Sequence, residues 1–196
     1  MARSKITETK DDVIEDSGSV LWSFVKGEQL EFPITLNFVK DVTAGYTYEA
    51  VVVEADNIPE DEKVPTTIRP NGVQTTLVVR VPPNRGMWDP GQAYNKEEIA
   101  FYNGEPYKLI HGVARISSVS PDLDSAWEKA DLSRVYLQFP KTLGATWSVQ
   151  PTVGHPAYGF FELRVTAPAD SIFQRTWKPV RGMVQILFSP TDIVPD

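Results

Sequence analysis

The clearest pattern along the chain is a strict alternation of apolar and polar residues from Gln29 to Val39. Because successive side chains of a strand point to opposite faces, this pattern predicts a strand with one buried face. Pro33 lies within the run and has no N–H group, so we expect the strand at the edge of a sheet or bulged at that residue. The apolar positions are Leu30, Phe32, Ile34, Leu36 and Phe38.

Further runs rich in β-branched and aromatic residues predict the remaining strands of a larger β-structure. The only helical candidate is the short segment Asp122–Leu132. The pattern therefore predicts an all-β protein. The additional strands are expected at Val20–Val25, Tyr46–Glu54 and Val73–Val81, then around Val135, Leu137 and Phe139, around Phe161, Leu163 and Val165, and around Val184, Ile186 and Phe188.

The alternation of apolar and polar residues is interrupted after Pro82-Pro83 and resumes near Ser133. The strands on either side are too few for a domain, but together they suffice for one β-sandwich of the Ig-like or jelly-roll type. We expect residues 20–82 and 133–196 to be two halves of that sandwich, interrupted by an inserted module at residues 83–132. Residues 1–19 are polar and charged, which is typical of a flexible N-terminal arm. This arm is either a mobile tail or a segment that becomes ordered against a neighbouring subunit.

The inserted segment contains a predicted hairpin. Two short runs, Ile99–Tyr102 and Glu105–Ile110, are joined by Asn103-Gly104. This dipeptide favours the positive φ angles of a type I′ turn. A hairpin alone is marginal in water, so we expect the surrounding aromatic side chains to cover it. These aromatic residues are Trp88, Tyr94, Tyr102, Tyr107 and Trp127.

The spacing of these aromatic residues carries a resemblance that covers about 40 of the 196 residues. The motif consists of Trp88, Tyr94, Glu98, Ile99, Tyr102-Asn103-Gly104, Tyr107, Pro121 and Trp127. It resembles the small chitin-binding modules of carbohydrate-binding families 5 and 12, and their relatives embedded in phage tail proteins. The resemblance implies a small, aromatic-rich β-domain that is similar to a carbohydrate-binding module.

The chain departs from that family at two places. In the sugar-binding relatives, exposed aromatic residues follow the Tyr that matches Tyr107, whereas residues 108–111 here are Lys, Leu, Ile and His. The Gly of the family's Gly-Asp pair is replaced by Glu97. We therefore expect the five aromatic residues to be structural, with direct contact to a glycan or a partner as the alternative.

The flanking halves carry a second resemblance. The stretch FVKGEQLEFPITLNF, residues 24–38, resembles the opening of Ig-like domains of phage baseplates. The stretch WKPVRGMVQILFSPTDIV, residues 177–194, is similar to the way such domains end. Together with the inserted motif, these stretches imply a bacteriophage virion protein of the tail, baseplate or fibre attachment.

The composition of the chain restricts the kinds of partner and site that we expect. The chain has no cysteine, which excludes disulfides and thiolate metal sites. Its net charge is −7 with scattered Lys and Arg, so we expect no nucleic-acid partner. The first dozen residues lack the apolar core of a signal peptide, and no stretch approaches the ~20 apolar residues of a membrane span. We expect a protein made in the host cytoplasm, not secreted by a signal peptide and not inserted in a membrane.

The search for chemistry finds no catalytic, cofactor or metal constellation. His111 and His155 belong to no zinc spacing and are interpreted as surface or packing residues. Asp122 and Asp124 lie two residues apart beside a proline, which does not resemble a glycosidase pair. The densest acidic group is read as a solvated loop, with cation binding left open. This group consists of Glu54, Asp56, Glu60, Asp61 and Glu62.

Three functions remain. The leading hypothesis is a non-enzymatic structural protein of a phage tail, which docks to other virion proteins and to copies of itself in a symmetric assembly. The alternative is a glycan-binding adhesin or accessory module that contacts a host cell surface. An enzyme is the third hypothesis.

Overall fold

The computed structural model describes residues 21–27, 29–55, 73–111, 115–116, 118–171 and 176–188. Across these ranges the chain forms thirteen strands and no helix, which confirms the all-β class. No helix in this part of the chain is therefore long and apolar enough to cross a membrane. The predicted N-terminal arm lies outside the described residues.

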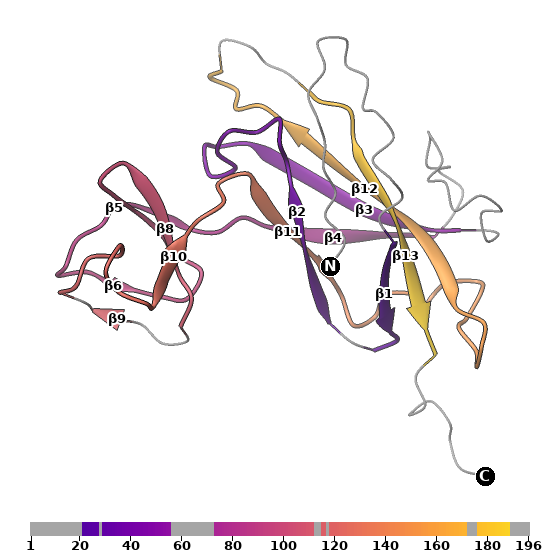
Figure 1. Ribbon diagram of the computed structural model, residues 1–196. Helices are drawn as coiled ribbons and strands as arrows, with labels where there is room; N and C mark the ends of the chain where they lie inside the picture. The colour runs from indigo at the N-terminus through magenta and orange to yellow at the C-terminus, as the bar shows by residue number, and fades with distance from the viewer. Residues whose placement is uncertain are drawn as a thin grey trace.

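The largest element is a seven-stranded mixed sheet, here called the curled sheet. Its order is β1-β13-β12-β3-β4-β11-β2, with β1 and β13 parallel and every other pair antiparallel. The sheet curls strongly into a half-barrel (Figure 1). The strands are β1 (Leu21–Val25), β2 (Leu30–Thr35), β3 (Thr47–Glu54), β4 (Gln74–Arg80), β11 (Arg134–Phe139), β12 (Ala157–Thr166) and β13 (Val180–Leu187).

Strand β4 is where the sheet changes neighbours. Its first residues, Gln74 to Leu77, pair with β3. Its last residues, Val78 to Arg80, pair with β11. One strand thus belongs to both halves of the sheet, so the two halves can fold toward each other around a common core.

Trp22 brings the two ends of the curled sheet together. It projects from β1 and stacks between Phe32 of β2, with ring centroids 4.7 Å apart, and Phe161 of β12, at 4.6 Å. Phe139 of β11 meets it edge-on at 5.9 Å. Because β1 and β2 are the first and last strands of the sheet order, this aromatic stack closes the core across the open side of the half-barrel.

The expected edge position of Pro33 is confirmed, because β2 is the last strand of the curled sheet. Leu36 donates its N–H to Ser133 on the β11 side. Alternation then directs the amides of residues 31, 33 and 35 to the free edge, where Pro33 has none to donate. The missing donor makes this edge a poor template for another strand.

Two sequence expectations need correction. The strand predicted over Gln29–Val39 ends at Thr35, because residues 37 and 38 turn and Val39 donates to the carbonyl of Leu36. The helical candidate Asp122–Leu132 is not a helix. The segment forms turns followed by a strand, since Asp124 accepts the amide of Ala126 with its side chain and so competes with helical hydrogen bonding.

A smaller group of strands lies to one side of the curled sheet (Figure 1). Four of these strands form the small sheet, with the order β10-β8-β7-β5, and two more pair as β6-β9. The chain enters this group through residues 81–83 and leaves it through residues 130–133. The strands are β5 (Asn84–Met87), β6 (Ala93–Tyr94), β7 (Ile99–Tyr102), β8 (Glu105–Leu109), β9 (Arg115–Ile116) and β10 (Trp127–Lys129).

Candidate functional site: the aromatic cluster and the joint

The hairpin of the small sheet has the predicted turn. Strands β7 and β8 are antiparallel, and Tyr102 pairs with Glu105 across Asn103-Gly104. Asn103 has φ 52° and Gly104 has φ 80°. Both central residues are therefore in the left-handed region, as a type I′ turn requires, and the prediction is confirmed.

The small sheet buries one face against its own loops. Cross-strand register places Ala100 of β7 beside Tyr107 of β8, and Leu109 of β8 beside Trp127 of β10. These side chains share a face because paired residues point the same way. The resulting aromatic cluster consists of Tyr94, Ala100, Leu109, Ala126 and Trp127, with Trp88 and Tyr107 packed against it.

Tyr94 and Trp127 lie at the centre of the aromatic cluster. Tyr94 is 1% exposed and Trp127 is 6% exposed. Their rings meet edge to face, 5.1 Å between centroids and 74° between planes. The amide of Asp89 donates to the Tyr94 hydroxyl at 2.8 Å, so the polar end of this buried ring is satisfied.

The other three predicted residues lie nearer the surface. Trp88 and Tyr102 are half-buried and also meet edge to face, at 5.5 Å and 88°. Tyr107 is half-buried against the aromatic cluster. The two aromatic pairs are nearly perpendicular, which suits packing better than a flat platform for a sugar ring.

Comparison with known proteins adds no relative. No protein-family model, no curated protein and no solved structure matches this chain.

The remaining candidates from the sequence are dispersed. His111 is exposed, and so is His155, which forms an isolated bridge with Thr152 in a turn. Asp122 is exposed in a turn, whereas Asp124 is buried and caps Ala126. Within the described ranges, no three His, Cys, Asp or Glu side chains are grouped so that they could hold a metal ion.

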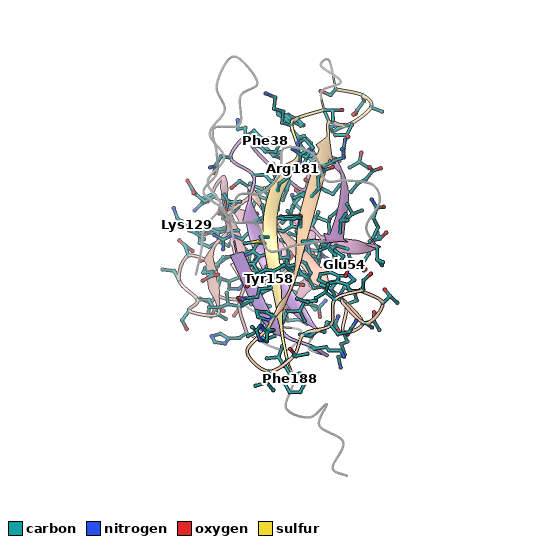
Figure 2. The ribbon with its side chains drawn as sticks, turned by 90° about the vertical axis from the view of Figure 1, so that its right-hand side faces the viewer. Phe38, Glu54, Lys129, Tyr158, Arg181 and Phe188 are labelled. Carbon is teal, nitrogen blue, oxygen red and sulfur yellow. The ribbon has the colours of Figure 1, made fainter. Side chains whose placement is uncertain are left out.

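Glu54 does not belong to a solvated loop. It ends β3 on the core side of the curled sheet, is 8% exposed, and accepts the amide of Val149 at 2.8 Å (Figure 2). The other acidic residues of the predicted loop, Asp56 and Glu60 to Glu62, lie outside the described residues. Whether the acidic loop binds a cation therefore concerns Asp56 and Glu60 to Glu62 alone, because Glu54 lies in β3.

A second polar group, which no local sequence pattern indicates, lies where the curled sheet meets the small sheet. We call it the joint cluster, and it consists of Glu31, Arg80, Glu97 and Tyr136. Nε of Arg80 donates to Oε2 of Glu31 at 2.9 Å, and Nη2 donates to Oε1. The guanidinium lies over the ring of Tyr136, 4.4 Å from its centroid, and Nη2 is 3.7 Å from Oε2 of Glu97.

Electrostatics in the joint cluster follow from these contacts. The hydrogen bonds from Arg80 lower the pKa of Glu31 below its ordinary value, and Gln138 adds a further donor at 2.7 Å. The same bond raises the pKa of Arg80. The four residues of the joint cluster are far apart in sequence. Only the strand register brings Glu31 of β2, Tyr136 of β11 and Arg80 of β4 together.

The curled sheet also carries a buried carboxylate on its outward side. Glu162 of β12 is 6% exposed. It accepts hydrogen bonds from Nε of Arg164 at 2.6 Å and from Nε of Arg181 at 2.8 Å. Figure 2 labels Arg181 on this side of the molecule. Pairing with two guanidinium groups compensates the burial of the charge, so this cluster has a structural explanation.

Proposed function

We propose that the chain is a non-enzymatic structural protein of a bacteriophage virion, a tail, baseplate or fibre-attachment component. It would dock to neighbouring virion proteins and to copies of itself. The observation that carries this proposal is the burial of Tyr94 and Trp127, at 1% and 6% exposed, inside the small sheet. Side chains that the resemblance associates with sugar-binding modules serve here as a core, which favours a scaffold over a glycan site.

The resemblance to baseplate domains suggests how the fold should be classified. We interpret the curled sheet as a variant of the predicted Ig-like or jelly-roll sandwich, formed by residues 20–82 and 133–196. Because β4 pairs with β3 through one half and with β11 through the other, two groups of strands share a single core as the sheets of a sandwich do. Residues 83–132 are then the inserted module.

Docking would use exposed apolar side chains on the small-sheet side. Met87 and Ile116 are each 68% exposed, and Leu123 is 78% exposed. Interfaces are enriched in methionine and aromatic residues at their centres and bury side chains of this kind. In a symmetric particle each copy would present the same contacts, with the N-terminal arm as an additional tether.

Electron microscopy of the native particle tests the proposal. We expect density for the curled sheet in several symmetry-related copies of a tail structure. A matched pair of variants identifies the docking side: Leu123→Asp is expected to reduce incorporation into particles, whereas Val153→Asp, at a similarly exposed position in the turn between β11 and β12, is not. Absence of the chain from purified particles would refute the proposal.

Glycan binding is the second candidate, and one observation favours it. Trp88 and Tyr102 keep part of their rings accessible at the surface of the small sheet. A glycan array would show binding that Trp88→Ala abolishes while the fold, checked by circular dichroism, is preserved. Retention of binding in that variant would exclude this pair as the site.

A further inference from the structure

The joint cluster suggests how the two sheets are held relative to each other. The chain crosses between them twice, through residues 81–83 and 130–133. Two short connectors on one side of a module permit a hinge motion unless other contacts oppose it. Arg80 is the last residue of β4 and immediately precedes the first connector.

Arg80 contacts both sheets at once. On the curled sheet it is held by Glu31 of β2 and by the ring of Tyr136 of β11. On the other side its Nη2 faces Glu97, which lies two residues before the buried start of β7 at Ile99. The side chain of Arg80 is 28% exposed, as is that of Glu97, so the pair is only partly screened by solvent.

The backbone of Glu97 points to the same role. Its φ is 72°, in the left-handed region, which costs a non-glycine residue about 1 kcal/mol or more. Its amide donates to the carbonyl of Leu109 at 2.8 Å, so the residue is fixed on the small sheet. A residue that retains a side chain where glycine fits better is a candidate for a function of that side chain.

We propose that Arg80 and Glu97 form a latch that fixes the orientation of the small sheet on the curled sheet, with the two connectors as the hinge. Glu31 and Tyr136 hold the guanidinium in position, and Glu97 is the arm contributed by the small sheet. A lateral contact supplements the latch, since Nδ2 of Asn84 donates to Oγ1 of Thr43 at 2.9 Å. This inference does not depend on the proposed function.

Spin labels can measure the orientation directly. The chain contains no cysteine, so two introduced cysteines give a single labelled pair. Thr47→Cys on β3 and Asp122→Cys in the turn before β10 replace exposed side chains in the two parts. In the otherwise unchanged full-length chain we expect one narrow distance distribution by pulsed electron paramagnetic resonance.

Glu97→Gln removes the charge but keeps the left-handed backbone, and it should raise the population outside the main distance by about two- to fivefold. Arg80→Met should have the same effect or a larger one. Salt at ~1 M should broaden the distance distribution of the chain with unchanged Arg80 and Glu97, because salt screens a partly exposed ion pair. The control Arg85→Met removes an arginine that faces Glu98 within the small-sheet part, and it should leave the distribution unchanged.

Glu97→Gly separates the latch from ordinary stability. Glycine relieves the left-handed strain, so the small sheet should become more resistant to unfolding while its orientation loosens. An unchanged distance distribution in Glu97→Gln and Arg80→Met, with the folded state verified by circular dichroism, would overturn the proposal. Equal broadening in Arg85→Met would also overturn it.

Discussion

The curled sheet and the small sheet are stabilised by cores of different kinds. Among the described residues, 20 buried hydrophobic residues form the core of the curled sheet and only 5 form that of the small sheet. The first core is mainly aliphatic and spread over long strands, whereas the second depends on two buried aromatic rings. A small sheet can be held by few side chains, but each of them then carries a larger share of its stability.

The largest expected effect is at the closure of the curled sheet. Trp22→Ala removes the ring that stacks between Phe32 and Phe161, and it should destabilise the protein by about 3–5 kcal/mol. Urea unfolding followed by far-ultraviolet circular dichroism measures this loss. Val153→Ala, at a 74% exposed position, is the control and should stay within about 0.5 kcal/mol. A similar small loss in Trp22→Ala would show that the sheet ends close without this ring.

Trp127→Ala tests whether the small sheet depends on its own core. We expect a loss of about 3 kcal/mol that is confined to residues 83–132, because the ring packs only within the aromatic cluster. Hydrogen exchange measured by region should show faster exchange in β7 and β8 and unchanged exchange in β12. Equal acceleration in both regions would mean that the two sheets unfold as one unit.

Gly159→Ala tests how tightly the curled sheet is packed. A Cβ atom at residue 159 would lie 2.5 Å from the ring of Trp147 and 2.9 Å from the carbonyl oxygen of Val53. Overpacking of this kind should cost about 1–3 kcal/mol. A denaturant midpoint equal to that of the unmodified chain would show that the Trp147 loop yields without cost.

Gly104→Ala makes the same substitution in the small sheet, where the cause is different. No atom lies within 4 Å of the added Cβ, but the residue has φ 80°. The expected loss is about 1 kcal/mol from backbone conformation alone. Asn103→Gly is the matched variant and should be close to neutral in thermal unfolding, since glycine also adopts φ 52° readily.

The smallest expected effect is the pH dependence at the joint cluster. The pKa of Glu31 is lowered in the folded state by Arg80, so its contribution to stability is present above the ordinary carboxyl pKa of about 4.3 and is lost as the pH falls through the lower folded value. Glu31→Gln should remove a few tenths of a kcal/mol of this acid sensitivity, because the pair is partly exposed. Urea midpoints of both proteins between about pH 6 and pH 3 measure the difference; parallel curves would contradict it.

Much of the β-structure could be predicted because local rules decide it. The alternation at Leu30, Phe32 and Ile34 places a strand, Pro33 places that strand at an edge, and Asn103-Gly104 specifies a type I′ turn. The early end of β2 at Thr35 could not be predicted in the same way. Leu36 and Val39 are buried although the chain turns between them, so an apolar pattern records burial rather than extension.

The candidate sites were predicted unevenly for the same reason. The aromatic residues are close in sequence, and four of the five gather in or against one aromatic cluster, with Tyr102 joined to it through Trp88. The joint cluster depends on strand register between distant segments, which no local pattern contains. The acidic pattern groups Glu54 with a solvated loop although the strand predicted over Tyr46–Glu54 includes it, and its pairing with Gly159 places it in β3.

The place of β13 in the sheet has a consequence for biosynthesis. Of the described strands, β1 is the first in the chain and joins the sheet only through β13, which lies between β1 and β12 and is the last of them in chain order. The backbone of β1 therefore has no strand to pair with until Val180–Leu187 has been synthesised, although the Trp22 ring can already stack on Phe32. The curled sheet therefore closes late, through slow, long-range pairing of β1 with β13, whereas all strands of the small sheet are synthesised before β13.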